Sequence, residues 1–309
     1  MQAQGGLGMI VAKSHKILLK TTPEHDATFT SWCGAARVTY NWGLERKIAA
    51  FREMGTSPGA FALMTEMVAL KQTDEYAWLN AVPKSVPRLV LLQLEFAYGH
   101  FFRRVKKGVE EKGFPKFKSK KRSTLSFHLE PDAIRVEGKR VRIPKLGWLK
   151  MHQAMRFEGK LVGTVCVSKV AGKWDIAFTV GIEMGEVENQ DKPVTGLDVG
   201  VKTLATLADG VEFENPKAFC RLERLLTRAQ RQVARTQKGS QRWQKATLRV
   251  QRIHTRIADV RANATHQVSG YVAKHDSGVA IEDLNVAGMV KNHSLAQAVL
   301  DANFAELHT

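Results

Sequence analysis

The sequence has little cysteine and no long apolar run. Three cysteines occur in 309 residues (Cys33, Cys166 and Cys220), and no two of them form a CxxC pair. This excludes a disulfide framework and a complete zinc ribbon within these residues, and it fits a reducing compartment. No apolar run approaches the ~18 residues of a transmembrane helix, and residues 1–8 lack the apolar core of a signal peptide. We therefore expect a cytoplasmic protein without a membrane segment.

Acidic residues are also scarce relative to basic ones. The chain has 47 Lys and Arg against 30 Asp and Glu, which gives a net charge of +17 and a pI near 9.9. A polyanionic partner is the simplest reason for this excess, although a solubility charge or a basic ribosomal-type protein is an open alternative. The sequence has no P-loop, dinucleotide fingerprint or Ser-His-Asp order, so those enzyme classes are not indicated. The length suits two or three domains.

The spacing of apolar residues predicts two kinds of structure in the first 183 residues. Residues 9–20 read as a strand, and a largely helical stretch follows from Thr22-Pro23 to about residue 107. From 125 to 183 the period changes to two, with turn signals at 137–140 and 171–173. We expect a small β-barrel from 9–20 plus 123–183, interrupted by a helical domain over 21–122.

A basic segment ends the helical stretch. Between residues 103 and 122, ten Lys and Arg face two glutamates, with Phe114 and Phe117 among them. Interleaved cations and rings suit a groove that holds a phosphate backbone, while a solvated linker is the alternative. The candidate nucleic-acid-binding residues here are Lys116, Lys118, Lys120, Lys121 and Arg122.

Two short apolar strands in the last third each carry a carboxylate. After a polar linker at 184–192, the strand Val194 to Gly200 holds Asp198, and the strand from Gly278 ends at Glu282. Burying a carboxylate is costly unless a partner such as a metal ion pairs with it. The alternative is an acid at the end of a strand that caps a turn and binds no metal. Adjacent strand residues alternate in direction, so we expect either Glu282 or Asp283 to face inward. Asp198 and Glu282 are a candidate pair for a divalent cation such as Mg²⁺.

Between these strands, basic residues recur at alternating steps of four and three. On a helix this spacing makes one cationic stripe, and Lys238-Gly239-Ser240 predicts a break into a helical hairpin. A solvated face usually mixes both signs, but only Glu223 and Asp259 are acidic between residues 217 and 261. We therefore favour phosphate contact over plain solvation. The candidate residues are Arg221, Arg224, Arg228, Arg231, Arg235, Arg242, Lys245, Arg249, Arg252 and Arg256.

Several motifs together resemble the TnpB (OrfB) family of insertion-sequence proteins. They are Gly196-Leu197-Asp198-Val199-Gly200-Val201-Lys202, the basic helical pair, Ile281-Glu282-Asp283-Leu284, Tyr40-Asn41-Trp42-Gly43-Leu44 and the run from Gly113 to Lys121. The resemblance implies an α+β multidomain fold. Its wedge-like β-barrel is interrupted by a helical recognition domain and followed by an RNase H-like (RuvC) domain, here 193–309.

The same resemblance implies a transposon-encoded, RNA-guided DNA endonuclease that acts at the bacterial nucleoid. Its partners would be a guide RNA and a double-stranded DNA target, and its cofactor Mg²⁺. Carried over by position, Asp198 and Glu282 would be the first two catalytic carboxylates and metal ligands. The oligomeric state stays open.

The chain departs from the family pattern after Glu282. Family members continue into a CxxC…CxxC zinc insert and a third RuvC motif with an Asp, so we expect the zinc ligands and the last RuvC elements to be absent here. Asp301 and Glu306 lie in a helix expected over 294–307, and we interpret them as surface residues. An RNA-guided DNA-binding protein without cleavage is the main alternative, and a plain RNA-binding protein is another.

Overall fold

The computed structural model describes residues 9–184 and 191–307, and helices and strands occur in both ranges. The predicted α+β class is therefore confirmed. The chain divides into two compact units, Met1–Gly185 and Glu186–Thr309, which we describe one at a time. The linker predicted at 184–192 falls mostly outside the described residues, and so do residues 1–8. No helix in the described ranges is long and apolar enough to span a bilayer.

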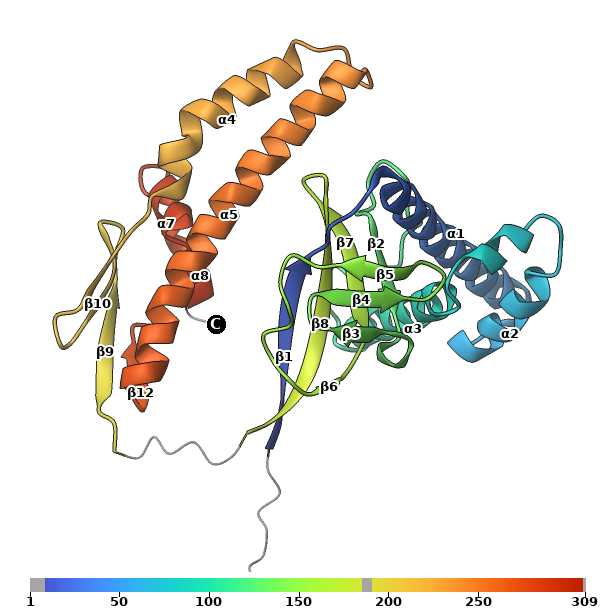
Figure 1. The fold of residues 1–309 in the computed structure, drawn as a ribbon, viewed down its shortest axis with the longest axis horizontal. Helices are drawn as coiled ribbons and strands as arrows, with labels where there is room; N and C mark the ends of the chain where they lie inside the picture. Colours follow the sequence, from blue (N-terminus) through green and yellow to red (C-terminus); the bar gives the residue numbers. More distant parts are fainter. Residues whose placement is uncertain (1–8, 185–190, 308–309) are drawn as a thin grey trace, which may run out of the picture. The chain divides into compact units, whose positions relative to one another are not determined.

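Antiparallel strands form two sheets in the first unit (Figure 1). The larger sheet has the order β1-β8-β7-β2, with β6 also paired to β8, and the smaller has the order β3-β4-β5. The bounds are β1 Met9–Leu18, β2 Ser126–Leu129, β3 Arg135–Glu137, β4 Arg140–Ile143, β5 Gly147–Lys150, β6 Lys160–Leu161, β7 Val165–Val170 and β8 Lys173–Met184.

The end of β1 joins the two sheets. All ten residues of β1 pair with β8, from Met9 opposite Met184 to Leu18 opposite Asp175. Beyond β1, the backbone N–H of Lys20 donates to the carbonyl of Lys150, the last residue of β5, at 2.8 Å. The first strand therefore pairs with strands that follow it by more than 100 residues.

Three α-helices lie in the chain between β1 and β2: α1 (Pro23–Met54), α2 (Ala60–Leu70) and α3 (Ser85–Lys106). Thr22 caps α1, because its hydroxyl accepts the N–H of His25 at 3.3 Å. The Phe29 ring on α1 packs against Phe127 on β2 and Trp174 on β8, with centroids 5.4 and 5.1 Å away. One buried apolar cluster thus extends through the helices and the strands of this unit.

The second unit is built on a four-stranded mixed sheet with the order β11-β10-β9-β12. β9 (Val194–Val199), β10 (Thr203–Leu207) and β11 (Glu212–Glu214) form an antiparallel meander, and β12 (Gly278–Ile281) runs parallel to β9. A parallel neighbour needs a long crossover connection, and here two helices provide it. These helices are α4 (Ala218–Ala234) and α5 (Gln241–His275).

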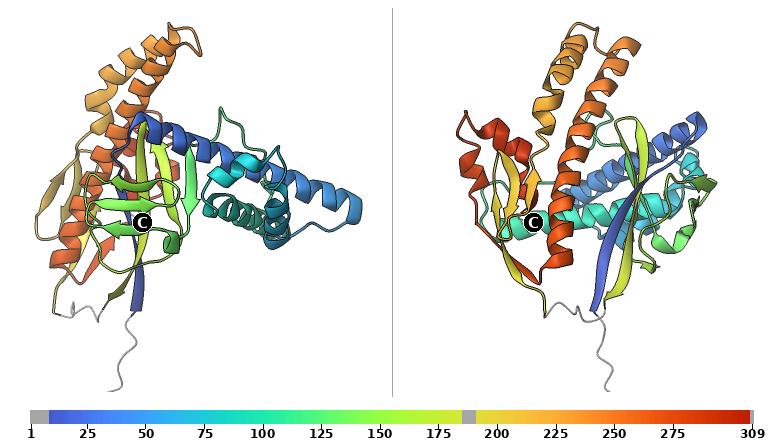
Figure 2. Two further views of the ribbon diagram at one scale, coloured as in Figure 1. Left: turned by 45° about the vertical axis from the view of Figure 1, so that its right-hand side comes forward. Right: turned by 60° about the vertical axis from the view of Figure 1, so that its left-hand side comes forward.

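The helices α4 and α5 form the predicted hairpin and run side by side (Figure 2). Gly239 ends the connection with φ +90°, and the Ser240 hydroxyl caps α5 by accepting the N–H of Trp243 at 3.1 Å. The buried residues between the two helices are Leu226, Ala229, Ile253 and Ile257, joined by Ala218 at the start of α4. Their spacing of three and four residues leaves the opposite face of each helix free for charge.

Short helices follow β12: α6 (Val286–Met289), α7 (Ala296–Ala302) and α8 (Phe304–Leu307). The single helix predicted over 294–307 is therefore wrong in detail, because Asn303 takes a left-handed conformation (φ +59°) that separates α7 from α8. Buried Val299 on α7 and Phe304 on α8 share an apolar cluster with Val268 on α5 and Leu197 on β9. These helices thus cover the Leu197 face of the sheet.

Candidate active site and nucleic-acid interface

The two predicted acids lie at neighbouring backbone positions, one on β9 and the other directly after the end of β12. β12 pairs with β9 in the register Gly278–Val194 to Ile281–Leu197, so the next position on each strand holds Glu282 and Asp198. Neighbouring strands lie ~4.8 Å apart, and both acids follow the same parallel direction. The fold therefore brings together two acids that are 84 residues apart in the chain. On its other side, Asp198 lies opposite Thr206 of β10.

The prediction that one of Glu282 and Asp283 faces inward is wrong. Asp198, Glu282 and Asp283 are all exposed, and neither Glu282 nor Asp283 faces inward. Asp198 alternates with buried Leu197, so it lies on the sheet face opposite the helices that cover Leu197. Glu282 and Asp283 follow the end of β12, where the strict alternation of a strand no longer applies.

This pair of acids fits a hydrated divalent cation. Mg²⁺ prefers oxygen ligands, keeps several waters and often takes only one or two carboxylates from the protein. Within residues 9–184 and 191–307, no group of three or more His, Cys, Asp or Glu side chains is placed to hold a metal. The donor set of Asp198 and Glu282 thus suits an open, water-rich site that a substrate can reach.

Asp301 has a structural role that its sequence position does not suggest. We expected a surface residue, but Asp301 is 5% exposed. Its carboxylate accepts the backbone N–H groups of Phe219 and Cys220 at 2.8 and 3.1 Å, in the first turn of α4. The Arg261 guanidinium on α5 donates to the same carboxylate at 3.0 and 3.1 Å. Asp301 therefore ties α4, α5 and α7 together and is not available to a metal.

The basic hairpin presents its cations to solvent. All ten predicted residues on α4 and α5 are exposed. Five of them form no ion pair with an acidic side chain in the described chain: Arg221, Arg224, Arg228 and Arg231 on α4, and Arg235 directly after it. Four of them, with Arg249 of α5, line a groove of 890 Å³ whose one acidic lining residue is Glu223. Unpaired guanidinium groups along a groove suit a polyanion.

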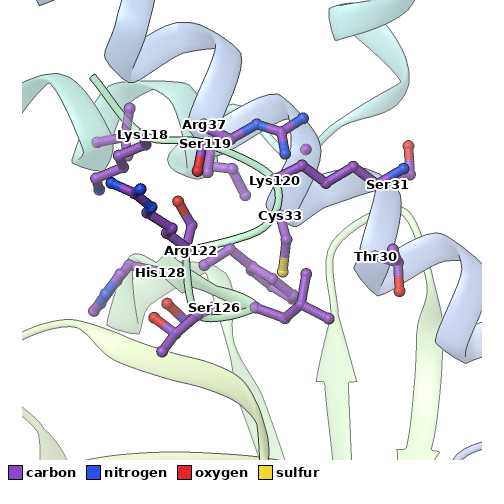
Figure 3. A pocket seen from close by; sticks show the side chains of 18 of the residues that line it. Thr30, Ser31, Cys33, Arg37, Lys118, Ser119, Lys120, Arg122, Ser126 and His128 are labelled. Carbon is purple, nitrogen blue, oxygen red and sulfur yellow. The ribbon is translucent and has the colours of Figure 1, made fainter. Parts of the chain in front are cut away.

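A second cationic groove, of 1040 Å³, lies in the first unit (Figure 3). The basic segment borders it with Lys118, Lys120, Lys121 and Arg122, and Phe117 lies beside them. Lys116 is exposed but does not line this groove. None of the described lining residues is acidic, so this surface also suits an anion.

The sequence pattern does not indicate three further lining residues with nitrogen-bearing side chains: Arg37 on α1, Gln93 on α3 and His128 on β2. No local pattern marks them, because only the packing of α1, α3 and β2 brings them together. Burial lowers the pKa of His128, and the nearby Lys118 ammonium lowers it further. The His128 imidazole is therefore neutral at neutral pH. Of these three residues, Arg37 is the one that adds a positive charge to the groove.

Lys118 differs from the other candidates. It is half-buried, and its ammonium lies over the Tyr40 ring, 4.0 Å from the centroid. Burial lowers the pKa of this ammonium. Lys118 therefore anchors the segment within the fold as well as bordering the groove.

Comparison with known proteins places the chain in a family. A family described as a probable transposase (OrfB) matches residues 177–293, and its helix-turn-helix domain matches residues 9–56. In this structure the second range holds β1 and a single long helix, α1, rather than two helices joined by a turn.

Three similar proteins have names that describe an RNA-guided DNA endonuclease. InsQ of Escherichia coli K12 is 31% identical over 91% of this chain and 68% of its own length. A Streptomyces pristinaespiralis protein is 29% identical over 97% of this chain and 73% of its length, and a Mycobacterium tuberculosis protein is 26% identical over 93% and 69%. A solved Cas12f1-sgRNA-target DNA complex matches at 10% identity with a TM-score of 0.48, over 97% of this chain and 87% of that one, a likeness too low to support an inference. The chain belongs to the OrfB (TnpB) family of probable transposases, to which InsQ is related.

Proposed function

We propose that this chain is a transposon-encoded, RNA-guided DNA endonuclease that hydrolyses phosphodiesters with a divalent cation. The observation that supports the proposal is the register of β9 and β12, in which Asp198 and Glu282 follow the last printed pair, Leu197 and Ile281. The same unit holds the exposed basic hairpin, and the relatives' names describe this activity.

The proposed architecture has three parts. A mixed sheet whose parallel strand returns through a helical crossover supports an RNase H-like (RuvC) domain over 193–309. The pairing of β1 with β8 supports a wedge-like barrel from 9–20 plus 123–183. The helices α1 to α3 would then form a recognition domain over 21–122.

Asp198 and Glu282 would hold the divalent cation. When bound there, such a cation lowers the pKa of its water and stabilises the leaving oxygen of a phosphodiester. The exposure of both carboxylates lets a bulky nucleic-acid strand approach them. The two acids would supply negative charge at this edge, and the β9–β12 ladder would keep their backbone positions close together.

The basic surfaces would hold the nucleic-acid backbone. Successive arginines on α4 are three or four residues apart, which places them about 5 Å apart along the helix axis. A row of cations with this spacing contacts phosphates without reading bases. Base pairing with a guide RNA would recognise the target DNA sequence, and the protein would bind the phosphate backbones of the strands.

Replacing Arg224, Arg228 and Arg231 together with glutamine tests the role of the hairpin. We expect the plot of log K against log[salt] for RNA binding to become shallower by about 2, because each phosphate contact on a single strand contributes roughly 0.7. A salt titration by fluorescence anisotropy measures this slope. A matched control replaces the exposed Arg135, Arg140 and Arg142 with glutamine, which removes the same charge from β3 and β4. Equal slopes for the two triple variants would contradict a specific role of α4.

Guide-dependent DNA binding without cleavage is the second candidate function. The exposed cations of α4 and α5 favour it, because holding a phosphate backbone needs no metal. RNA that copurifies with the chain should be sequenced and then used to program binding of a matched DNA duplex. Binding with strand scission in Mg²⁺ supports the endonuclease, and binding without scission supports the second function. Failure of any RNA to direct DNA binding would contradict both.

A further inference from the structure

The side chain of Asn41 on α1 holds the main chain of Lys118, 77 residues later. Its amide nitrogen donates to the Lys118 carbonyl at 2.9 Å, and its amide oxygen accepts the Lys118 N–H at 2.8 Å. One side chain thus satisfies both backbone groups of one residue, as a neighbouring strand would. Asparagine suits this role because it offers a donor and an acceptor on one short side chain.

The segment held in this way has no helix or strand of its own. It runs from the end of α3 at Lys106 to the start of β2 at Ser126. The Phe114 ring meets Tyr98 and Phe101 edge-on, with centroids 5.6 and 5.2 Å away, and Pro115 is buried. Further along the segment, Asn41 holds the main chain of Lys118 by two hydrogen bonds, directly before the groove cations at 120–122.

The groove cations come directly after this attachment. Ser119 begins a tight turn, since its carbonyl accepts the N–H of Ser123 at 2.9 Å. Lys120, Lys121 and Arg122 lie within this turn and line the groove with Arg37 of α1 (Figure 3). Because Asn41 and Arg37 are on the same helix, the hydrogen bonds also set the turn's position relative to Arg37.

We propose that Asn41 is a positioning residue for this anion-binding groove. It holds the backbone at Lys118, so the cations at 120–122 and Arg37 meet a phosphate backbone in an arrangement that exists before binding. Ordering a loose basic loop on binding would cost conformational entropy and lower the affinity. The inference rests on the proposed function, because it requires that the chain bind nucleic acid.

The test compares Asn41→Ala and Asn41→Asp with a matched control, Asn80→Ala. Asn80 also donates its side-chain amide to a backbone carbonyl, that of Lys71 at 3.1 Å, but it does not line the groove. The probe is a 20-base-pair DNA duplex, titrated across a salt series against the full chain. Trypsin digestion reports in parallel on how tightly residues 120–122 are held.

We expect Asn41→Ala to bind about 10-fold more weakly, with a shallower salt slope and faster trypsin cleavage after residues 120–122. Asn41→Asp keeps the acceptor for the Lys118 N–H, but its second carboxylate oxygen repels the Lys118 carbonyl and adds negative charge beside the groove, so it should also bind more weakly than wild type. Cleavage that rises after residues 120–122 and not at other basic residues would separate the loss of this attachment from a general loss of stability. If Asn41→Ala does not fold, Asn41→Asp against wild type still decides the question through slope and cleavage rate.

Two results would overturn this inference without contradicting the proposed function. In the first, both Asn41 variants match Asn80→Ala in affinity, slope and cleavage rate. In the second, a Lys120→Ala, Lys121→Ala, Arg122→Ala variant binds the duplex as wild type does, so the groove holds no phosphates. Absence of salt-dependent binding by the wild-type chain would instead contradict the proposed function itself.

Discussion

Asp198→Asn is expected to lower the rate of guide-dependent DNA cleavage by at least about 10³-fold, because it removes a charged ligand from a catalytic unit. Binding of RNA and DNA should stay unchanged, since Asp198 lies on β9 and lines neither of the two cationic grooves. The measurement is a single-turnover cleavage rate in Mg²⁺. Glu282→Gln should show the same loss, because it removes the charge of the adjacent carboxylate.

Asp209→Asn is the matched control for this experiment. Asp209 is an exposed acid in the turn after β10, and its side chain accepts the N–H of Val211 at 3.0 Å, a contact that asparagine can keep. Its cleavage rate should equal that of the wild type. If Asp198→Asn cleaved as fast as Asp209→Asn, the metal-holding role of Asp198 would be wrong.

Asp301→Ala is expected to cause the largest loss of stability in the second unit. The change leaves the Arg261 guanidinium without its buried partner, and it removes the acceptor of two backbone N–H groups at the start of α4. Breaking one side of a buried ion pair typically costs about 3–5 kcal/mol. Urea denaturation measures the unfolding free energy, and hydrogen exchange at Phe219 and Cys220 reports the local opening.

Two variants separate the contributions of Asp301. Asp301→Asn keeps an acceptor for the α4 N–H groups but loses the charge that faces Arg261, so its loss should be intermediate. Asp259→Ala removes an exposed acid from α5 and should change stability little. Equal stability of Asp301→Ala and Asp259→Ala would show that the junction does not support the hairpin.

The sequence predicts best where the signal is local. The three- and four-residue spacing of the cations and apolar residues is a property of one helix at a time, so the α4–α5 hairpin and its break near Gly239 could be read directly. The β1 strand and the helix start at Thr22 follow from the same kind of local pattern.

Long-range packing decides what the sequence does not predict. Asp301 caps a helix that begins 83 residues earlier, so no spacing reveals its burial. Arg37 becomes a groove residue only because α1 packs beside the 117–125 segment. The strand pattern predicted acids on two strands that turn out to be neighbours, but it could not show that the sheet face bearing Asp198 is exposed.

The most direct test of RNA-guided cleavage is to exchange the guide. The chain is combined with either of two RNAs that differ in the guide segment alone, and each complex receives two labelled DNA duplexes, one matched to each guide, in Mg²⁺. The account predicts that each complex cuts its own matched duplex and spares the other, and that Asp198→Asn binds the matched duplex without cutting it. Cleavage that ignores the guide, or cleavage that survives Asp198→Asn, would contradict it.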